Sequence, residues 1–142
     1  MTVNIKAKNL AELYRDAAEK FQDLPAFGTR DKNKTFQSVS FGEVYERGIN
    51  LATALIDLGV QARDHVALLA DNRLEWIIAD YGILITGAAD VPRGTDVTDS
   101  DITYILPHSE AKVCFVENKA VLEKIEKNRS KLPLIKTIVM MD

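Results

Sequence analysis

Apolar residues recur along the chain in two alternating patterns, and this alternation predicts an α/β fold. The second half contains four short apolar runs separated by stretches with helical spacing; the runs are HVALLA, AADVP, KVCFVE and KTIVMM. Short continuous apolar runs between helices are typical of parallel strands that are buried on both faces. We therefore predict a mostly parallel sheet of βαβ units with right-handed crossovers.

Small polar residues before the helical stretches predict where helices begin. In the second half, the expected caps and helix ends are Asn72 to Thr86, Thr98 to Pro107, and Asn118 to Asn128. Glu75 stands three residues after Asn72, as in a capping box. The charges at i,i+4 spacing in the last of these helices indicate a solvated face.

The first half predicts two helices joined by a β-hairpin. Asn9 with Glu12 starts a helix that runs to about Phe21, and PAFGTR and KTFQSVS flank the turn-rich DKN of the hairpin. Ser40 with Glu43 then opens a long helix that ends at Gly59, where a left-handed residue is favoured. The apolar stripes expected to face the core are Leu10, Leu13, Ala17, Ala18 and Phe21 in the first helix, and Val44, Leu51, Leu55 and Leu58 in the second.

Two features suggest that residues 1–142 are one N-terminal α/β part of a larger protein. The helix from Leu74 to Ile85 is apolar on nearly every side, and Gly82 within it costs about 1 kcal/mol relative to alanine unless close packing compensates. The chain also stops on the apolar run KTIVMMD, with nothing after it to cover a strand. A fragment of this kind is expected to bind the remainder of its parent protein, or to self-associate through the open strand.

Composition narrows the class of protein. A chain of 142 residues with 46% hydrophobic residues, 27% charged residues and a net charge of -3 is typical of a globular domain and has no basic footprint for nucleic acid. Its most apolar stretch, WIIADYGILITGAADV, is too short to span a bilayer and is interrupted by Asp80 and Asp90. The single cysteine and the polar start without a leader-like apolar region predict a cytoplasmic protein, which in the parent can be peripheral to a membrane.

Candidate chemistry gathers where the predicted strands end, because ligands of open α/β sheets bind beyond the carboxyl ends of the strands. These ends carry Asp71-Asn72, residues 92–97, Glu117-Asn118 and Asp142. The loop VPRGTDVT has only one glycine, and neither phosphate-binding glycine motif occurs in the chain. Arg93 has the chemistry to bind a carboxylate or phosphate, but we interpret it as bridging to Asp90, Asp96 or a neighbouring segment.

The remaining reactive side chains are interpreted as structural. Asp96, Asp99 and Asp101 miss the spacing of a calcium loop, and the last two suit the N-terminus of a helix. Cys114 lies within a strand and is expected to be inert. The others are His65 and His108, read as surface or capping residues, and Trp76 and Tyr81, read as core. We assign no catalytic, substrate-binding or metal-binding residue.

The segment from FGEVYERGINLATALIDLGV through HVALLADNRLEWIIADYGILITGAADVPRGTDVT resembles the start of adenylate-forming acyl-CoA synthetases. The matching features are L-x-x-L-G-V, V-A-L-L, N-R-x-E-W and a small-residue turn into Val-Pro, and they cover nearly the whole chain from about Leu10. Many relatives carry an aromatic residue before Val-Pro and Leu-Asp or Leu-Asn after it. Here Asp90 precedes it and Arg93-Gly94-Thr95-Asp96 follow, which is most similar to the long-chain fatty acid–CoA ligase branch.

The resemblance implies a parent enzyme that uses ATP, magnesium and CoA. A fatty acid carboxylate attacks the α-phosphate of ATP to give an acyl-adenylate, and the CoA thiol then displaces AMP. The family's phosphate loop, Tyr-Gly-x-Thr-Glu segment, ribose-binding aspartate and C-terminal lysine do not occur in these residues, so the resemblance implies that the chain alone is inactive. It also places the VPRGTDVT loop beside the site as scaffold.

A free-standing flavodoxin-like regulatory or binding domain, such as a phosphoacceptor receiver, is the alternative. A receiver needs clustered acids after its first strand, an aspartate at the end of the third and a lysine at the end of the fifth. The predicted strands end instead at Asp71, Val91, Glu117 and Asp142, and Lys136 starts a strand. The receiver pattern therefore fails.

Overall fold

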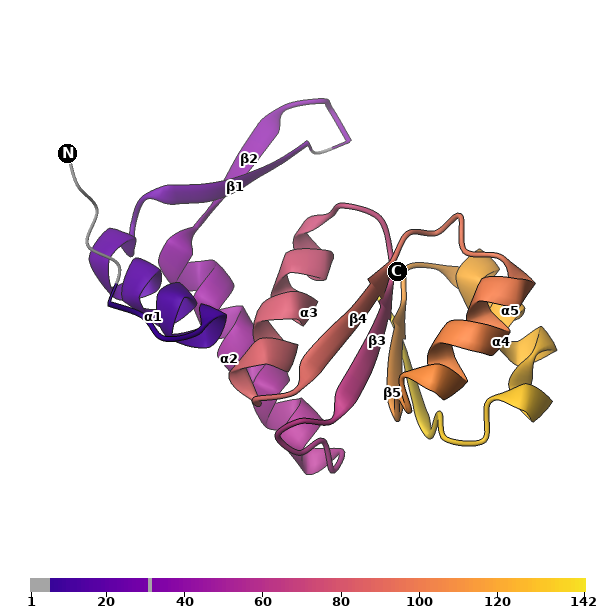
Figure 1. Cartoon of the computed structure of the whole chain (residues 1–142). Coiled ribbons are helices and arrows are strands. Elements are labelled where there is room, and N and C mark those ends of the chain that lie inside the picture. The colour runs from indigo at the N-terminus through magenta and orange to yellow at the C-terminus, as the bar shows by residue number, and fades with distance from the viewer. Residues whose placement is uncertain (1–5, 31) are drawn as a thin grey trace.

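The structure is a computed structural model that describes residues 6–30 and 32–142 (Figure 1). Residues 1–5, in the stretch from which a polar start was predicted, and Asp31, in the predicted turn, lie outside the described residues. The helices and strands, in chain order, are α1 (Leu10–Phe21), β1 (Pro25–Arg30), β2 (Phe36–Ser40), α2 (Phe41–Asp57), β3 (His65–Leu69), α3 (Leu74–Ile85), β4 (Ala89–Arg93), α4 (Asp99–His108), β5 (Val113–Val116), α5 (Lys119–Lys127), η1 (Arg129–Lys131) and β6 (Thr137–Met140).

The four strands of the second half form one parallel sheet in the order β4-β3-β5-β6. Ala67 of β3 pairs with Val91 on one side and with Cys114 on the other, so β3 lies inside the sheet. β1 and β2 pair antiparallel as a separate hairpin. The predicted α/β class, the parallel sheet and the hairpin are therefore confirmed, whereas the short 3₁₀ helix η1 was not predicted.

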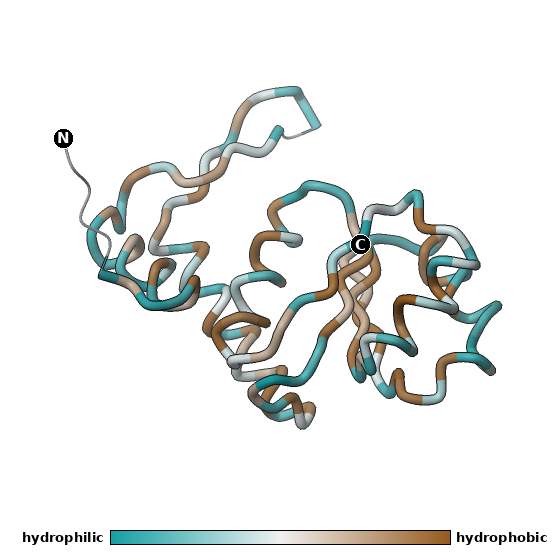
Figure 2. Tube along the Cα trace, in the orientation of Figure 1, coloured by the Kyte–Doolittle hydropathy of each residue, from teal (hydrophilic) through white to brown (hydrophobic). Residues whose placement is uncertain are grey.

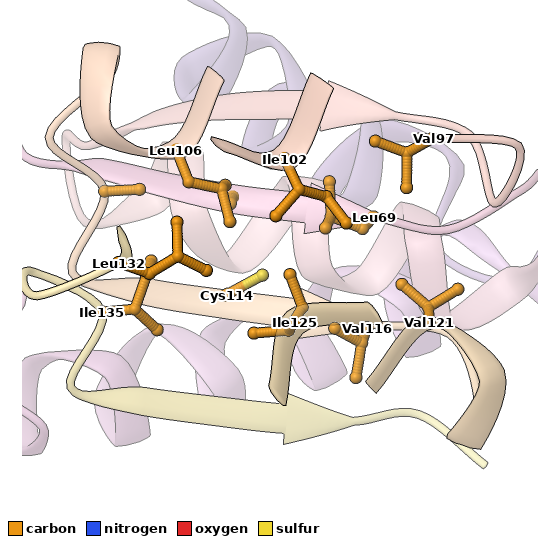
Figure 3. Close-up of a cluster of buried hydrophobic side chains, with 12 residues drawn as sticks. Leu69, Val97, Ile102, Leu106, Cys114, Val116, Val121, Ile125, Leu132 and Ile135 are labelled. Carbon is orange, nitrogen blue, oxygen red and sulfur yellow. The ribbon is translucent and has the colours of Figure 1, made fainter. Parts of the chain in front are cut away.

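Helices cover the two faces of the sheet in two separate groups (Figure 1). α1, α2 and α3 lie on one side, where Val66 and Leu68 of β3 pack with Leu55 and Ile83. α4 and α5 lie on the other, and Figure 3 shows their side chains around Cys114 and Leu69. Alternate residues of β3 thus point into two different cores, which is why its sequence is apolar without interruption.

Side-chain caps fix the start of four helices. Asn9, Ser40, Thr98 and Asn118 each accept a hydrogen bond from the backbone N–H three residues later. Thr98 forms the complete reciprocal box, because the Asp101 carboxylate also accepts from the Thr98 backbone N–H. These four predicted starts are confirmed.

The predicted cap at Asn72 is wrong. α3 begins one residue later, with Arg73 at the N-cap position and no side-chain cap. The Arg73 guanidinium instead donates to Glu75 at 2.7 Å and to Asp142 at 2.6 Å. The Asp142 contact joins the loops after β3 and β6, and no local pattern in the sequence indicates it.

The apolar stripes predicted to face the core are buried in the middle of α1 and α2 but exposed at the helix ends. Val44 and Leu55 of α2 are fully buried, whereas Leu58 is 51% exposed. Leu58 is already the C-cap residue, and Gly59 follows with φ of 88°, so the chain turns away from the helix face at this point. Leu10 and Phe21 are also exposed, because they lie at the two ends of α1, at the margins of its packed face.

α2 and α3 approach each other closely through two glycines. A Cβ atom on Gly48 would lie 2.9 Å from Cβ of Tyr81, and a Cβ atom on Gly82 would lie 2.9 Å from the Leu51 side chain. Such separations are too short for any side chain, so both positions need glycine. This close packing compensates for the helix propensity that Gly82 lacks.

The burial expected for α3 is met largely by this chain itself. Residues 79–83 are buried against α1, α2 and the sheet, and Glu75 is the exposed residue of the helix. The last strand, expected to be bare, is half-covered: Ile138 packs on one core, and Val139 packs on the other. β6 pairs with β5 and forms the edge of the sheet.

α1 is attached through a buried carboxylate. The Tyr14 hydroxyl donates to Asp80 at 3.0 Å, and the Tyr14 ring stacks on Tyr81 at 3.6 Å between centroids. Asp80 is only 9% exposed. Burial raises its pKa, the Tyr14 hydrogen bond opposes that rise, and the charge of Asp90 adds to it.

Hydropathy follows this architecture. Figure 2 shows apolar residues concentrated in the strands of the sheet, and hydrophilic residues at the hairpin tip and in the connecting loops. Within residues 6–30 and 32–142, none of the helices combines the length and the apolar character needed to cross a bilayer.

The glycine contact predicts that Gly48→Ala destabilises the protein. Helix propensity alone would favour alanine by about 1 kcal/mol, but overlap with Cβ of Tyr81 should outweigh it and lower the free energy of unfolding by about 1–3 kcal/mol. Urea unfolding measures the change, and Glu46→Ala, on the exposed side of the same helix, is the matched control. An increase in stability for Gly48→Ala would mean that the helices separate at little cost.

The buried carboxylate predicts a pH-dependent stability. Because the folded-state pKa of Asp80 is raised, its stabilising protonation is complete below the unfolded pKa of about 4 and is lost as pH rises through the folded value. Asp80→Asn should therefore be more stable than the wild type at pH 7, and the difference should shrink toward pH 4. Thermal unfolding across pH 4–8 measures this, with exposed Asp57→Asn as the control. Parallel curves for the wild type and Asp80→Asn would contradict the prediction.

Candidate functional site

The carboxyl ends of the parallel strands meet at one edge of the sheet, beside the C-terminus in Figure 1. The chain runs from β3 outward to β4 and then crosses back over β3 to β5. Such a reversal opens a crevice between the loops that follow the two diverging strands, and ligands of open α/β sheets bind there. Here those loops begin at Ala70 and Glu117.

Asp71 connects this crevice to the loop after β4. Its carboxylate accepts hydrogen bonds from the Thr95 backbone N–H at 2.9 Å and from the Thr95 hydroxyl at 2.6 Å. These two bonds, the hydroxyl first, lower the pKa of Asp71. The backbone N–H of Asp71 donates to the Glu117 carboxylate at 2.7 Å, so the loops after β3, β4 and β5 are linked.

Lys124 holds the same loop from the opposite side. Its ammonium group, on α5, donates to the carbonyl oxygens of Thr95 at 3.0 Å and Val97 at 2.8 Å. Gly94 lies against the Asp71 and Asp96 carboxylates, and a Cβ atom there would be 3.0 Å from each. The loop from Gly94 to Val97 is therefore fixed on both sides by charged side chains.

An open cleft of about 650 Å³ lies next to this loop. Trp76 and Arg93 contribute an aromatic ring and a cation to its wall, and the other lining residues are Ala70, Asp71, Asn72, Pro92 and Gly94. A second cavity, of about 720 Å³, lies between the hairpin and the start of α3, with Phe27, Arg30 and Arg73 among its lining residues. The cleft beside the loop, with its aromatic ring and its cation, has the side chains expected of a site that binds a polar ligand.

Arg93 makes the structural contact that was expected of it. Its guanidinium lies 3.5 Å from the Asp101 carboxylate, in a neighbouring segment, with the two side chains 42% and 36% exposed. Asp90 and Asp96, the other two partners considered, are not its ion-pair partners. An exposed pair at this distance contributes little to stability and leaves the guanidinium accessible.

The acidic residues of the loop serve the following helix. Asp101 accepts from both the backbone N–H and the hydroxyl of Thr98, and these bonds lower the pKa of its carboxyl. The Asp99 carboxylate accepts hydrogen bonds from Lys127 and Asn128, at the C-terminal end of α5. The Lys127 bond is the main cause of the lowered pKa of Asp99. Within residues 6–30 and 32–142, no three His, Cys, Asp or Glu side chains come together as a metal site.

The remaining candidates lie apart from this edge. Cys114 is buried in the core, where burial raises the pKa of its thiol to about 12. His65 begins β3, and His108 ends α4, where it stacks on Tyr104. These positions favour the structural interpretations given to the three residues.

Trp76 is the exception among the residues read as core. Tyr81 is buried against Tyr14, as expected, but Trp76 is half-buried and reaches both the core under α3 and the cleft.

The sequence placed Asp71 at this edge of the sheet but did not indicate its partner Thr95, and it gave no role to Lys124. The N-R-x-E-W motif contains Trp76 and was the one sequence pattern that pointed to it. Lys124 lies in a helix whose charged residues were predicted to face solvent.

The family model described as "AMP-binding enzyme" matches residues 14–142, which is nearly all of the chain. The chain belongs to this family. The match confirms the resemblance drawn from the sequence and sets aside a free-standing flavodoxin-like domain of another family.

Curated relatives extend far beyond the matched region. The chain is 27% identical over 140 residues to the long-chain-fatty-acid–CoA ligase heimdall of Drosophila melanogaster, covering 96% of this chain and 21% of the relative. It is 35% identical over 106 residues to surfactin synthase subunit 1 of Bacillus subtilis strain 168, covering 75% of this chain and 3% of that protein. The chain thus spans about a fifth of the length of the CoA ligase and far less of the synthase.

Solved structures show the same fold. The crystal structure of the anthranilate CoA ligase AuaEII in complex with anthranoyl-AMP superposes with a TM-score of 0.84 at 25% identity, covering 97% of this chain and 26% of that chain. The strand order and the separate hairpin are thus those of an adenylate-forming enzyme domain.

The exposed Arg93 pair predicts how Arg93→Ala behaves in the full-length protein. If this exposed pair is the only role of Arg93, its loss should change soluble yield or Tm slightly, and the chemical step by less than about tenfold. Lys119→Ala, which removes a looser and more exposed ion pair, is the control. Intact folding with a turnover at least a hundredfold lower, roughly 2.7 kcal/mol of transition-state stabilisation, would instead place Arg93 in contact with the reacting groups.

Proposed function

We propose that residues 1–142 are the N-terminal part of an ATP-dependent ligase that activates a long-chain fatty acid and transfers it to CoA. The observation that carries this proposal is the family match over residues 14–142, together with a relative named as a long-chain-fatty-acid–CoA ligase over 96% of the chain. The Arg93-Gly94-Thr95-Asp96 loop, similar to that branch in sequence, supports the same substrate class.

We further propose that the site for ATP and magnesium is supplied by the rest of the enzyme. Gly94 is the one glycine of the strand-end loops, and the Asp71 carboxylate beside it is occupied by Thr95. A phosphate cradle needs several backbone N–H groups that converge, and magnesium needs free oxygen ligands. We therefore assign no step of acyl-adenylate formation to this chain, and propose that it is inactive without the rest of the enzyme.

The chain contributes instead a rigid edge of the sheet and one wall of a cleft. Asp71, Thr95 and Lys124 fix that wall, and Trp76 and Arg93 face the cleft from it. The partners proposed for the chain are the remainder of the enzyme and, through it, fatty acid, ATP and CoA. We further propose a cytoplasmic location, because the one cysteine is a buried free thiol, as in proteins of reducing compartments.

When residues 1–142 stand alone, the edge strand β6 provides a surface for self-association. Met140 is 44% exposed on this strand, and β5 pairs with one of its two edges. Unpaired strand edges favour pairing with another chain.

The test compares the full-length protein with residues 1–142. The full-length protein should catalyse pyrophosphate exchange into ATP only when a long-chain fatty acid is present, and should form the thioester when CoA is added. The 142-residue chain should show neither reaction. A full-length protein that accepts aromatic or amino acids but no fatty acid would refute the substrate class, and adenylate formation by residues 1–142 would refute the proposed division of labour.

A further inference from the structure

The loop Gly94–Val97 is held by two residues that are far from it in sequence. Asp71, after β3, accepts from the N–H and the hydroxyl of Thr95, at 2.9 and 2.6 Å. Lys124, on α5, donates to the carbonyls of Thr95 and Val97 at 3.0 and 2.8 Å. Hydrogen bonds in which one partner is ionised are roughly twice as strong as neutral ones. Surface loops are usually the mobile parts of a fold, so four such bonds to Thr95 and Val97 need an explanation.

Capping of the next helix is not that reason. Thr98 and Asp101 cap α4 by themselves, through bonds in both directions. Neither Asp71 nor Lys124 contributes to that cap. The two residues therefore act on the loop backbone.

The loop reaches the cleft at its first residue. Gly94 lines the cleft together with Asp71, Arg93 and Trp76. Thr95 and Val97, which follow Gly94 in the chain, hold it in place from behind. Asp71 is itself held by its N–H bond to Glu117, so its position follows β5 as well as β3. A side chain at position 94 would push against Asp71. The wall of the cleft and the residues that fix it are thus one connected unit.

We propose that Asp71 and Lys124 are positioning residues: by holding the loop Gly94–Val97, they keep Gly94 and the adjoining Arg93 as a preformed part of the cleft wall for a substrate of the ligase. This inference rests on the proposed function. A preformed wall avoids the entropic cost of ordering the loop when substrate binds. Loss of either residue should therefore raise KM for the substrate that meets the wall, with a smaller effect on kcat.

The experiment uses the full-length protein and the variants Asp71→Ala and Lys124→Met. Lys119→Met, on the exposed side of the same helix as Lys124, is the matched control. KM and kcat are measured for fatty acid, ATP and CoA in turn, and amide hydrogen exchange is followed at Val97. The Val97 N–H bonds to the Gly94 carbonyl within the loop, so it reports the loop conformation without being a direct partner of either mutated side chain.

Both variants, but not the control, should exchange the Val97 amide at least tenfold faster and raise KM for at least one substrate at least tenfold, with kcat within threefold. If the Val97 amide exchanges at the wild-type rate in both variants, Asp71 and Lys124 do not hold the loop, whatever the values of KM and kcat. Faster exchange with all three KM values within twofold overturns the link to substrate binding. A wild-type protein that is inactive with all three substrates refutes the proposed function instead, and the exchange data then still decide whether the loop is held.

Discussion

The close approach of α2 and α3 at Gly48 and Gly82 is the contact on which the arrangement of the chain depends. The hairpin packs on α2, and α1 packs on α2 and α3, while α3 in turn packs on β3 and β4. The first half of the chain is therefore joined to the sheet mainly through this helix pair. A side chain at either glycine would separate the two helices, and the separation would reach α1, the hairpin and the core under α3 together.

Much of this fold follows from patterns that are local in sequence. Four continuous apolar runs predicted the four parallel strands, because strands buried on both faces have no polar side. Asn9, Ser40, Thr98 and Asn118 predicted helix starts because a side-chain oxygen next to free N–H groups needs nothing from the rest of the chain. The cap predicted at Asn72 is wrong: Arg73 takes the N-cap position and contacts Asp142, which is distant in sequence.

The candidate site also combines features that local sequence predicts with contacts between residues that are distant in sequence. Sequence reasoning placed Asp71 and the Val-Pro loop at the ligand edge, because the carboxyl ends of parallel strands share one edge. It could not pair Asp71 with Thr95, or Lys124 with the carbonyls of that loop, because neither contact has a signature in spacing. A relative named as a CoA ligase and one named as a surfactin synthase subunit match 96% and 75% of this chain. Most of the chain is thus similar to parts of proteins with different names.

The sheet order has a consequence for how the chain folds as it is synthesised. β3 is made before both of its neighbours, but one of its edges waits for β5, which emerges only after α3, β4 and α4. α1, the hairpin, α2 and α3 can associate as soon as they leave the ribosome, because their contacts are among early elements. Until β5 arrives, the backbone of residues 66–69 has an unpaired edge on that side, and Ala67 and Leu69 lack the β5 and α5 side chains that later cover them. During that interval the nascent chain is exposed to aggregation at the very strand that later lies inside the sheet.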